Sequence, residues 1–158
     1  MMAVPKHTAL FLLILLAACN KATPPSPIKA IATREEIMHH LVIPNAKVVW
    51  DASGTIYTKD GVTERSPKNI DEWFTVEASA TTLMEAGNLL MMEGRAMDNG
   101  KWIERALALR DASDAVRQAA KKKDIVGLFD RGGDLFETCQ ACHSQYRFTK
   151  DEMKTRSY

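Results

Sequence analysis

Five consecutive residues near the C-terminus, Cys139-Gln140-Ala141-Cys142-His143, combine two thiols with an imidazole at a fixed spacing. On a helix, Cys139, Cys142 and His143 occupy positions i, i+3 and i+4, so the three side chains share one face. This CxxCH arrangement suits covalent attachment of haem c, because two thiols can add to the two vinyl groups of the porphyrin while the adjacent imidazole reaches the iron. The motif predicts one covalent haem with His143 as an iron ligand.

Three other kinds of site remain open for the same residues. A thioredoxin-like redox motif is typical of a helix start beside a strand, whereas this motif comes late in a predicted helix. A zinc site needs further ligands, and the only other histidines after the N-terminal apolar segment are His39 and His40. A structural disulfide gives no reason for a histidine directly after the second cysteine. Haem attachment is therefore favoured over all three.

The N-terminal residues are typical of an export signal. Lys6 and His7 precede an apolar run of residues 9–18, which is shorter than the roughly 20 residues that a membrane-spanning helix requires. The tetrapeptide 16–19, Leu-Ala-Ala-Cys, resembles the bacterial lipoprotein cleavage box. We expect residues 1–18 to be removed as a signal peptide and Cys19 to be lipidated, although a plain secretory signal with a chance cysteine is the alternative.

Residues 19–32 are rich in proline and poor in large apolar groups, which is typical of a semi-extended tether. The predicted location is the periplasmic side of a bacterial membrane, with attachment through the lipid anchor. Residue 20 is Asn and not the aspartate that is associated with inner-membrane retention in some bacteria, which weakly favours the outer membrane. The choice between the inner and the outer membrane stays open. Loss of Lys6 leaves 20 Lys and Arg against 20 Asp and Glu, so the mature chain is neutral and has no charge pattern for nucleic acid.

Four helical stretches follow the tether within a predicted domain of residues 33–158. The first begins with a capping box at Thr33 and runs to about Asp51, with a kink expected at Pro44. Residues 51–66 form a long loop, with a brief extended pair around Asp60-Gly61.

The second predicted helix has Ser66 as N-cap before Pro67 and ends near Gly94. The third begins in residues 98–100 and closes with lysines 121–123, which favour the negative end of a helix dipole. The fourth follows Asp124 and contains Gly132-Gly133, where a partner helix or a flat ligand could approach closely. These stretches predict an all-α fold, an antiparallel four-helix bundle.

A four-helix bundle behind an export signal, with CxxCH near the end of the last helix and Tyr146-Arg147 after it, resembles the class II cytochromes c. These are cytochrome c′ and its low-spin, methionine-ligated relatives, and the resemblance covers about residues 33–148. It implies that Cys139 and Cys142 form the thioethers, that His143 is the proximal ligand and that Arg147 lies near its imidazole. It also implies that the other face of the iron meets a residue of the first helix.

In the low-spin relatives that residue is a methionine in an Arg-x-x-x-Met pattern, which residues 34–38 match. Met38 is therefore expected to be the second axial ligand. Packing of Met38 without a bond to iron is one alternative, and ligation by His39 or His40 is another. Phe136 and Tyr146 are candidates for the wall of the haem cavity, from their nearness to the motif, whereas the three tryptophans are assigned to the core.

The sequence contains no acid, base or nucleophile constellation apart from the haem motif, so no enzyme activity is predicted. The expected function is one-electron transfer with His143 and Met38 as axial ligands. The alternative is a five-coordinate haem protein that binds nitric oxide or carbon monoxide; a peroxidase-like role lacks a distal acid–base residue. Expected partners are unidentified redox proteins, the membrane through the lipid anchor and, as an open possibility, a second copy in a homodimer.

Overall fold

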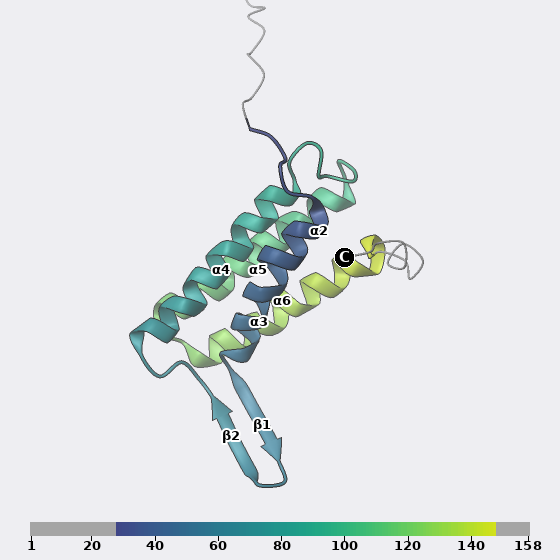
Figure 1. The fold of residues 1–158 in the computed structure, drawn as a ribbon. Helices are drawn as coiled ribbons and strands as arrows, with labels where there is room; N and C mark the ends of the chain where they lie inside the picture. Colours follow the sequence, from purple (N-terminus) through teal and green to yellow (C-terminus); the bar gives the residue numbers. More distant parts are fainter. Residues whose placement is uncertain (1–27, 148–158) are drawn as a thin grey trace, which may run out of the picture.

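The computed structural model describes residues 28–147, which form a mostly helical domain with one β-hairpin (Figure 1). The predicted signal peptide (1–18), the lipidated Cys19 and the last residues of the predicted haem domain (148–158) lie outside this described part. Of the predicted tether, only residues 28–32 are described. No described helix is long and apolar enough to cross a membrane.

The N-terminal helical segment consists of three consecutive pieces, α2 (Arg34–Glu36), η1 (Ile37–Val42) and α3 (Ile43–Asp51). It opens with the predicted capping box, in which the Glu36 N–H donates to Thr33 Oγ1 at 3.1 Å and the Thr33 N–H donates to Glu36 Oε2 at 2.8 Å. Both the predicted start and the predicted end of this first helical stretch are confirmed.

A π-helical turn interrupts this segment just before the proline. In η1 the Ile43 N–H donates to the carbonyl of Met38, five residues back, instead of four. Pro44 comes next, in the first turn of α3, and has no N–H to donate. The disturbance expected at Pro44 thus takes the form of a wider turn on its N-terminal side, a feature that often marks functional positions in helices.

The stretch predicted as a long loop is a β-hairpin. Strands β1 (Gly54–Thr58) and β2 (Gly61–Arg65) pair antiparallel with Thr58 opposite Gly61, so that Lys59 and Asp60 form the turn. The brief extended pair around Asp60-Gly61 is confirmed but is longer than expected. The hairpin projects from the helices (Figure 1).

Helix α4 (Ile70–Leu90) begins later than predicted. Its N-cap is Asn69, whose Oδ1 accepts from the Glu72 N–H at 2.9 Å, while the Glu72 carboxylate accepts from the Lys68 N–H. The prediction of Ser66 as the N-cap was therefore wrong. Strand β2 continues to Arg65, so the chain uses residues 66–69 to connect the strand to the helix.

The last two helices have the predicted bounds. Helix α5 spans Lys101–Lys122, and α6 spans Ile125–Tyr146. Asp124 caps α6 by accepting from the Gly127 N–H at 2.9 Å.

Three long helices, α4, α5 and α6, pack against one another through α5, and the N-terminal segment lies on α4 (Figure 1). The all-α class is confirmed for the main body, whereas the hairpin adds a small sheet. Gly87 allows a close approach of α4 to α5, since a Cβ there would lie 2.9 Å from the Ala106 carbonyl oxygen. Trp102 of α5 is buried and donates to the Leu90 carbonyl at 2.8 Å, which ties the same two helices together.

We expect Gly87→Ala to destabilise the protein, because its new Cβ must push against helix backbone rather than a flexible side chain. Gly133→Ala is the matched control, since a Cβ at Gly133 meets no atom within 4 Å and alanine favours a helix. The free energy of unfolding, measured in urea, should be about 1–3 kcal/mol lower for Gly87→Ala than for Gly133→Ala. Equal values for both variants would contradict the close contact.

Candidate functional site

The CxxCH residues lie in the last two turns of α6. Cys139 and Cys142 are half-buried free thiols, and His143 is exposed. Because the helix is continuous to Tyr146, the three side chains do share one face, as the spacing requires. The motif is therefore presented by rigid secondary structure rather than by a loop.

Both thiols are held in their protonated form. Burial, and next the neighbouring Cys142, raise the pKa of Cys139 to about 11. Burial also raises the pKa of Cys142, and the guanidinium of Arg105 partly offsets this rise. A redox-active CxxC requires the opposite shift, a thiol with a lowered pKa. The environment thus disfavours the thioredoxin-like interpretation.

Loss of hydration and the nearby charge of Arg147 lower the pKa of His143. Both effects favour the neutral imidazole, which is the form that binds a metal. Arg147 is the exposed residue directly after α6, close enough to act on the ring electrostatically. The neighbourhood of Arg147 and His143 expected from the family resemblance is compatible with this geometry.

Tyr146 fixes the end of α6 against α5. Its ring packs edge-on against Trp102 with 5.1 Å between ring centroids, and its hydroxyl donates to Asp98 Oδ2 at 2.5 Å. This hydrogen bond raises the pKa of Tyr146 to about 12 and lowers the pKa of Asp98. Tyr146, predicted as a wall of the haem cavity, thus has a structural role beside the motif. Asp98 was predicted only as part of a helix start, and its hydrogen bond to Tyr146 was not foreseen.

Phe136 lies one turn before Cys139 and packs edge-on against Trp50 of α3, with 5.7 Å between ring centroids. The Trp50 indole N–H donates to the Gly132 carbonyl at 3.0 Å. Gly132 is buried beneath the Trp50 ring, so the glycine pair does permit the predicted close approach of another helix. Trp50 was assigned to the core; it is instead 36% exposed, and its contact with α6 could not be read from helical spacing.

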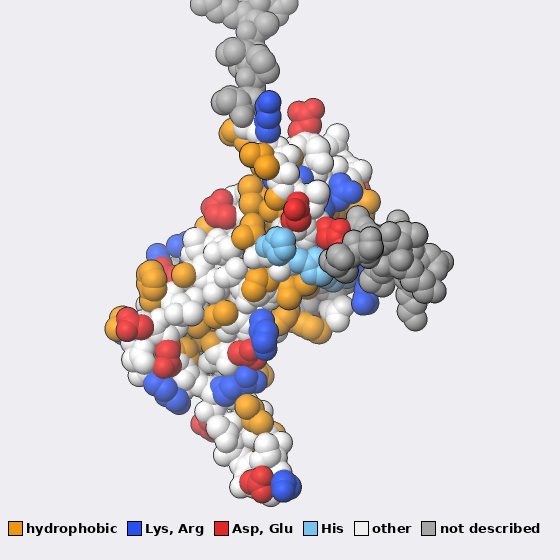
Figure 2. Space-filling model, viewed as in Figure 1, with side chains coloured by type: hydrophobic (Ala, Val, Ile, Leu, Met, Phe, Trp, Pro, Cys, Tyr) orange, Lys and Arg blue, Asp and Glu red, His pale blue; other side chains and the backbone are white. Residues whose placement is uncertain are grey.

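Met38 belongs to the π-turn η1 and is half-buried, packed against the edge of the core. His39 and His40, the alternative iron ligands, are both exposed on the same turn. Figure 2 shows histidine side chains, in pale blue, next to one another on this face of the molecule. Within residues 28–147, η1 packs on α4 and α6 packs on α5, but η1 and α6 do not pack closely on each other.

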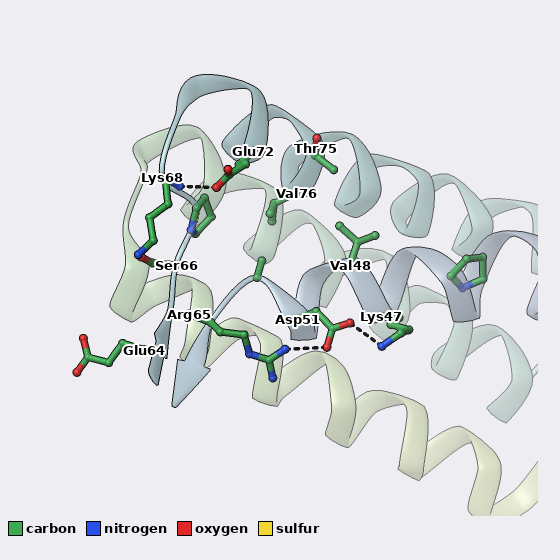
Figure 3. A pocket seen from close by; sticks show the side chains of 13 residues that line it. Lys47, Val48, Asp51, Glu64, Arg65, Ser66, Lys68, Glu72, Thr75 and Val76 are labelled. Carbon is green, nitrogen blue, oxygen red and sulfur yellow. Dashed lines mark hydrogen bonds and ion pairs between the residues drawn. The ribbon is translucent and has the colours of Figure 1, made fainter. Parts of the chain in front are cut away.

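The surface hollows of the described part include two that can be compared with the motif. The larger, of about 640 Å³, lies between α3, the end of β2 and the start of α4 (Figure 3). Three of its charged side chains are engaged with one another: Lys47 and Arg65 converge on Asp51 at 2.6 and 3.1 Å and lower the pKa of that carboxyl. The smaller hollow, of about 560 Å³, includes Trp50 and Phe136. Neither is lined by the CxxCH residues.

Within residues 28–147, no three His, Cys, Asp or Glu side chains are grouped so that they could hold a metal ion by themselves. A protein-only zinc site at the motif is therefore not supported by the described residues. Comparison of the chain with protein families, curated proteins and solved structures finds no match.

The raised thiol pKa predicts a slow reaction with alkylating reagents in the haem-free protein. In a Cys19→Ser/Cys142→Ala variant the contribution of Cys142 is lost, but burial, the larger cause of the raised pKa, remains. Cys139 should therefore react with iodoacetamide at pH 7.5 at least about tenfold more slowly than a cysteine of unperturbed pKa, since only the thiolate attacks. The rate should keep rising above about pH 9. The same variant in denaturant is the control, and a plateau of the native rate near pH 7 would indicate an activated redox thiol instead.

Proposed function

We propose that this chain is a lipid-anchored haem c protein of the cytochrome c′ type that transfers single electrons on the periplasmic side of a bacterial membrane. The observation that carries the proposal is the presentation of Cys139, Cys142 and His143 on one face of a continuous helix. The lipid anchor rests on the sequence around Cys19, which lies outside the described residues. The proposal includes the finer fold assignment, a four-helix bundle whose first helix is the composite segment α2–η1–α3.

The described residues fit a haem in three respects. Two half-buried thiols supply the two thioether positions, and an imidazole with a lowered pKa follows directly. Two aromatic side chains flank the motif on the same helix, Phe136 before it and Tyr146 after it. The proposed second ligand, Met38, is half-buried on η1, which does not pack closely on α6.

When bound, haem supplies the one-electron redox couple, and the chain determines its ligands and surroundings. Cys139 and Cys142 hold it to α6, His143 provides a nitrogen ligand, and Met38 provides a thioether, a ligand that raises the reduction potential. Burial, and next the charge of Arg147, lower the pKa of His143 and so favour the neutral imidazole. The contact of Tyr146 with Trp102 and Asp98 fixes the end of the helix that carries these groups.

Binding of nitric oxide or carbon monoxide is the second candidate function. One observation favours it: Met38 already packs against the hydrophobic core, as a methionine would that lines the pocket without binding iron. In that case the iron is five-coordinate, and the distal side admits a diatomic gas. The residue that faces the iron distinguishes the two functions.

Attachment can be tested in a bacterial host with a cytochrome c maturation system. Cys139→Ala/Cys142→Ala should yield no haem that stays on the polypeptide in a denaturing gel, because both thioethers are lost. Each single variant should yield a small amount with one thioether. Ser53→Ala is a control outside the motif, and it should mature normally. Unchanged covalent haem in the double variant would rule out attachment through this motif.

The role of Met38 can be tested by absorption and resonance Raman spectra of the ferric holoprotein. If Met38 binds the iron, Met38→Ala should change the spectrum from low spin to high spin, open access to carbon monoxide and lower the reduction potential. Met91→Ala is a matched control, since Met91 is also half-buried at the edge of the core. A low-spin spectrum that survives Met38→Ala would make His39 the next ligand to test.

A wild-type protein that is high spin before any substitution would favour the gas-binding function. In that case Met38→Ala should alter carbon monoxide affinity without changing the spin state.

A further inference from the structure

The smaller hollow lies beside the motif, on the surface between the end of α3 and the first half of α6. It has a volume of about 560 Å³ and is lined by nine residues of these two elements and the turn after α3. Three aromatic rings line it and are exposed: Trp50 by 36%, Phe136 by 49% and Phe129 by 60%. A cluster of exposed aromatic rings around a concave surface is typical of a binding surface rather than of a plain helix face.

The hollow exists because of the glycine pair. Gly132 and Gly133 line it, and neither provides a side chain to fill the space under the rings. Trp50 is fixed by its hydrogen bond to the Gly132 carbonyl and by its edge-on contact with Phe136. The aromatic surface is thus preorganised, so that a partner that docks there need not order these side chains first.

Carboxylates surround the aromatic rings. Asp130, Asp134 and Glu137 line the hollow and are exposed, whereas Arg131 of the same helix donates to Asp134 at 2.7 Å. Three carboxylates against one guanidinium give this surface a negative charge, although the mature chain as a whole is expected to be neutral. The charge is therefore concentrated beside the aromatic surface.

The surface is close to the site of attachment. Phe136 comes three residues before Cys139, and one helical turn is about 5.4 Å long. If the haem is bound as proposed, a protein docked on this hollow lies next to the helix that holds the haem.

We propose that this acidic, aromatic hollow is the docking site of a redox protein with lysines or arginines around an apolar contact patch. This inference rests on the proposed electron-transfer function. The charge selects the occupant: a second copy, related by a twofold axis, would bring carboxylates against carboxylates, which costs free energy. An anionic membrane surface would be repelled for the same reason.

The composition of the surface also matches the kinetics that electron transfer needs. A small apolar contact gives a weak complex that separates quickly, and complementary charge accelerates its formation. The acceleration by charge depends on ionic strength, because exposed charges are screened over about 10 Å at 0.1 M salt and over about 30 Å at 0.01 M salt.

The test uses the holoprotein with a soluble, lysine-rich cytochrome c as the probe. Asp130→Lys/Glu137→Lys reverses two carboxylates and leaves the Arg131–Asp134 pair intact. Asp71→Lys/Glu93→Lys is the matched control, with the same change in net charge at two exposed residues that do not line the hollow. The second-order rate of electron exchange, measured by stopped flow at about 0.01 M salt, should fall at least about tenfold in the first variant and much less in the control.

The wild-type rate should also decrease as salt increases, and Phe129→Ser should weaken binding of the probe in calorimetry without changing the net charge. Reduction by a small uncharged quinol should be unchanged in all three variants, which shows that the haem itself is intact. Equal slowing in both charge variants, or a rate independent of salt, would overturn the docking site. So would sedimentation that shows a wild-type dimer dissociated by Phe129→Ser, because a second copy would then occupy the hollow.

Failure of the proposed function gives a different result. A protein whose haem is removed by extraction with acidic organic solvent, or that holds no haem at all, fails the proposed function whatever the exchange rates are. Calorimetry with the probe can still be done on that protein, and loss of binding in Asp130→Lys/Glu137→Lys but not in the control would support the surface alone.

Discussion

The close packing of α4 against α5 at Gly87 is the contact on which the rest of the structure depends. The N-terminal segment lies on α4, and α6 lies along α5, so each is positioned by one member of this pair. The N-terminal segment and α6 contact each other where Trp50 of α3 covers Gly132 of α6. The distance between η1 and the CxxCH end of α6 is therefore set by the central pair and by the tryptophan contact.

The missing N–H of Pro44 adds a second constraint. Hydrogen bonding shifts to the π pattern just before the proline, where Ile43 donates to Met38. A π-turn changes the angular order of the side chains that precede it, so the presentation of Met38 and His39 is not that of a regular helix. This local geometry bears directly on which residue faces an iron atom bound to His143.

Much of the fold could be predicted because short-range rules determine it. The Thr33 capping box, the Asp124 cap and the helical spacing of the motif act within one or two turns, and they are all present in the structure. The start of α4 was wrong because Ser66 and Asn69 both satisfy the rules for an N-cap, and only the length of β2 decides between them.

Some features of the fold were not indicated by the sequence. The contact of Trp50 with α6 joins residues 82 positions apart in the chain. The π-turn and the full length of the hairpin are local, but only the packed structure shows where the hydrogen bonds shift and where the strand pairing ends. For the candidate site, spacing alone indicated that the thiols and the imidazole share a face. The raised thiol pKa and the acidic rim of the hollow required the packed structure.

The central claim is that one haem is covalently bound through Cys139 and Cys142. The most direct measurement is intact-mass spectrometry of the full-length protein, produced in a bacterium with a cytochrome c maturation system and extracted with acidic organic solvent to remove any non-covalent haem. The account predicts a polypeptide whose mass is increased by one haem, with peptide fragments placing the haem on residues 139–143. A polypeptide that loses all haem on extraction and retains two alkylatable thiols at Cys139 and Cys142 would contradict it.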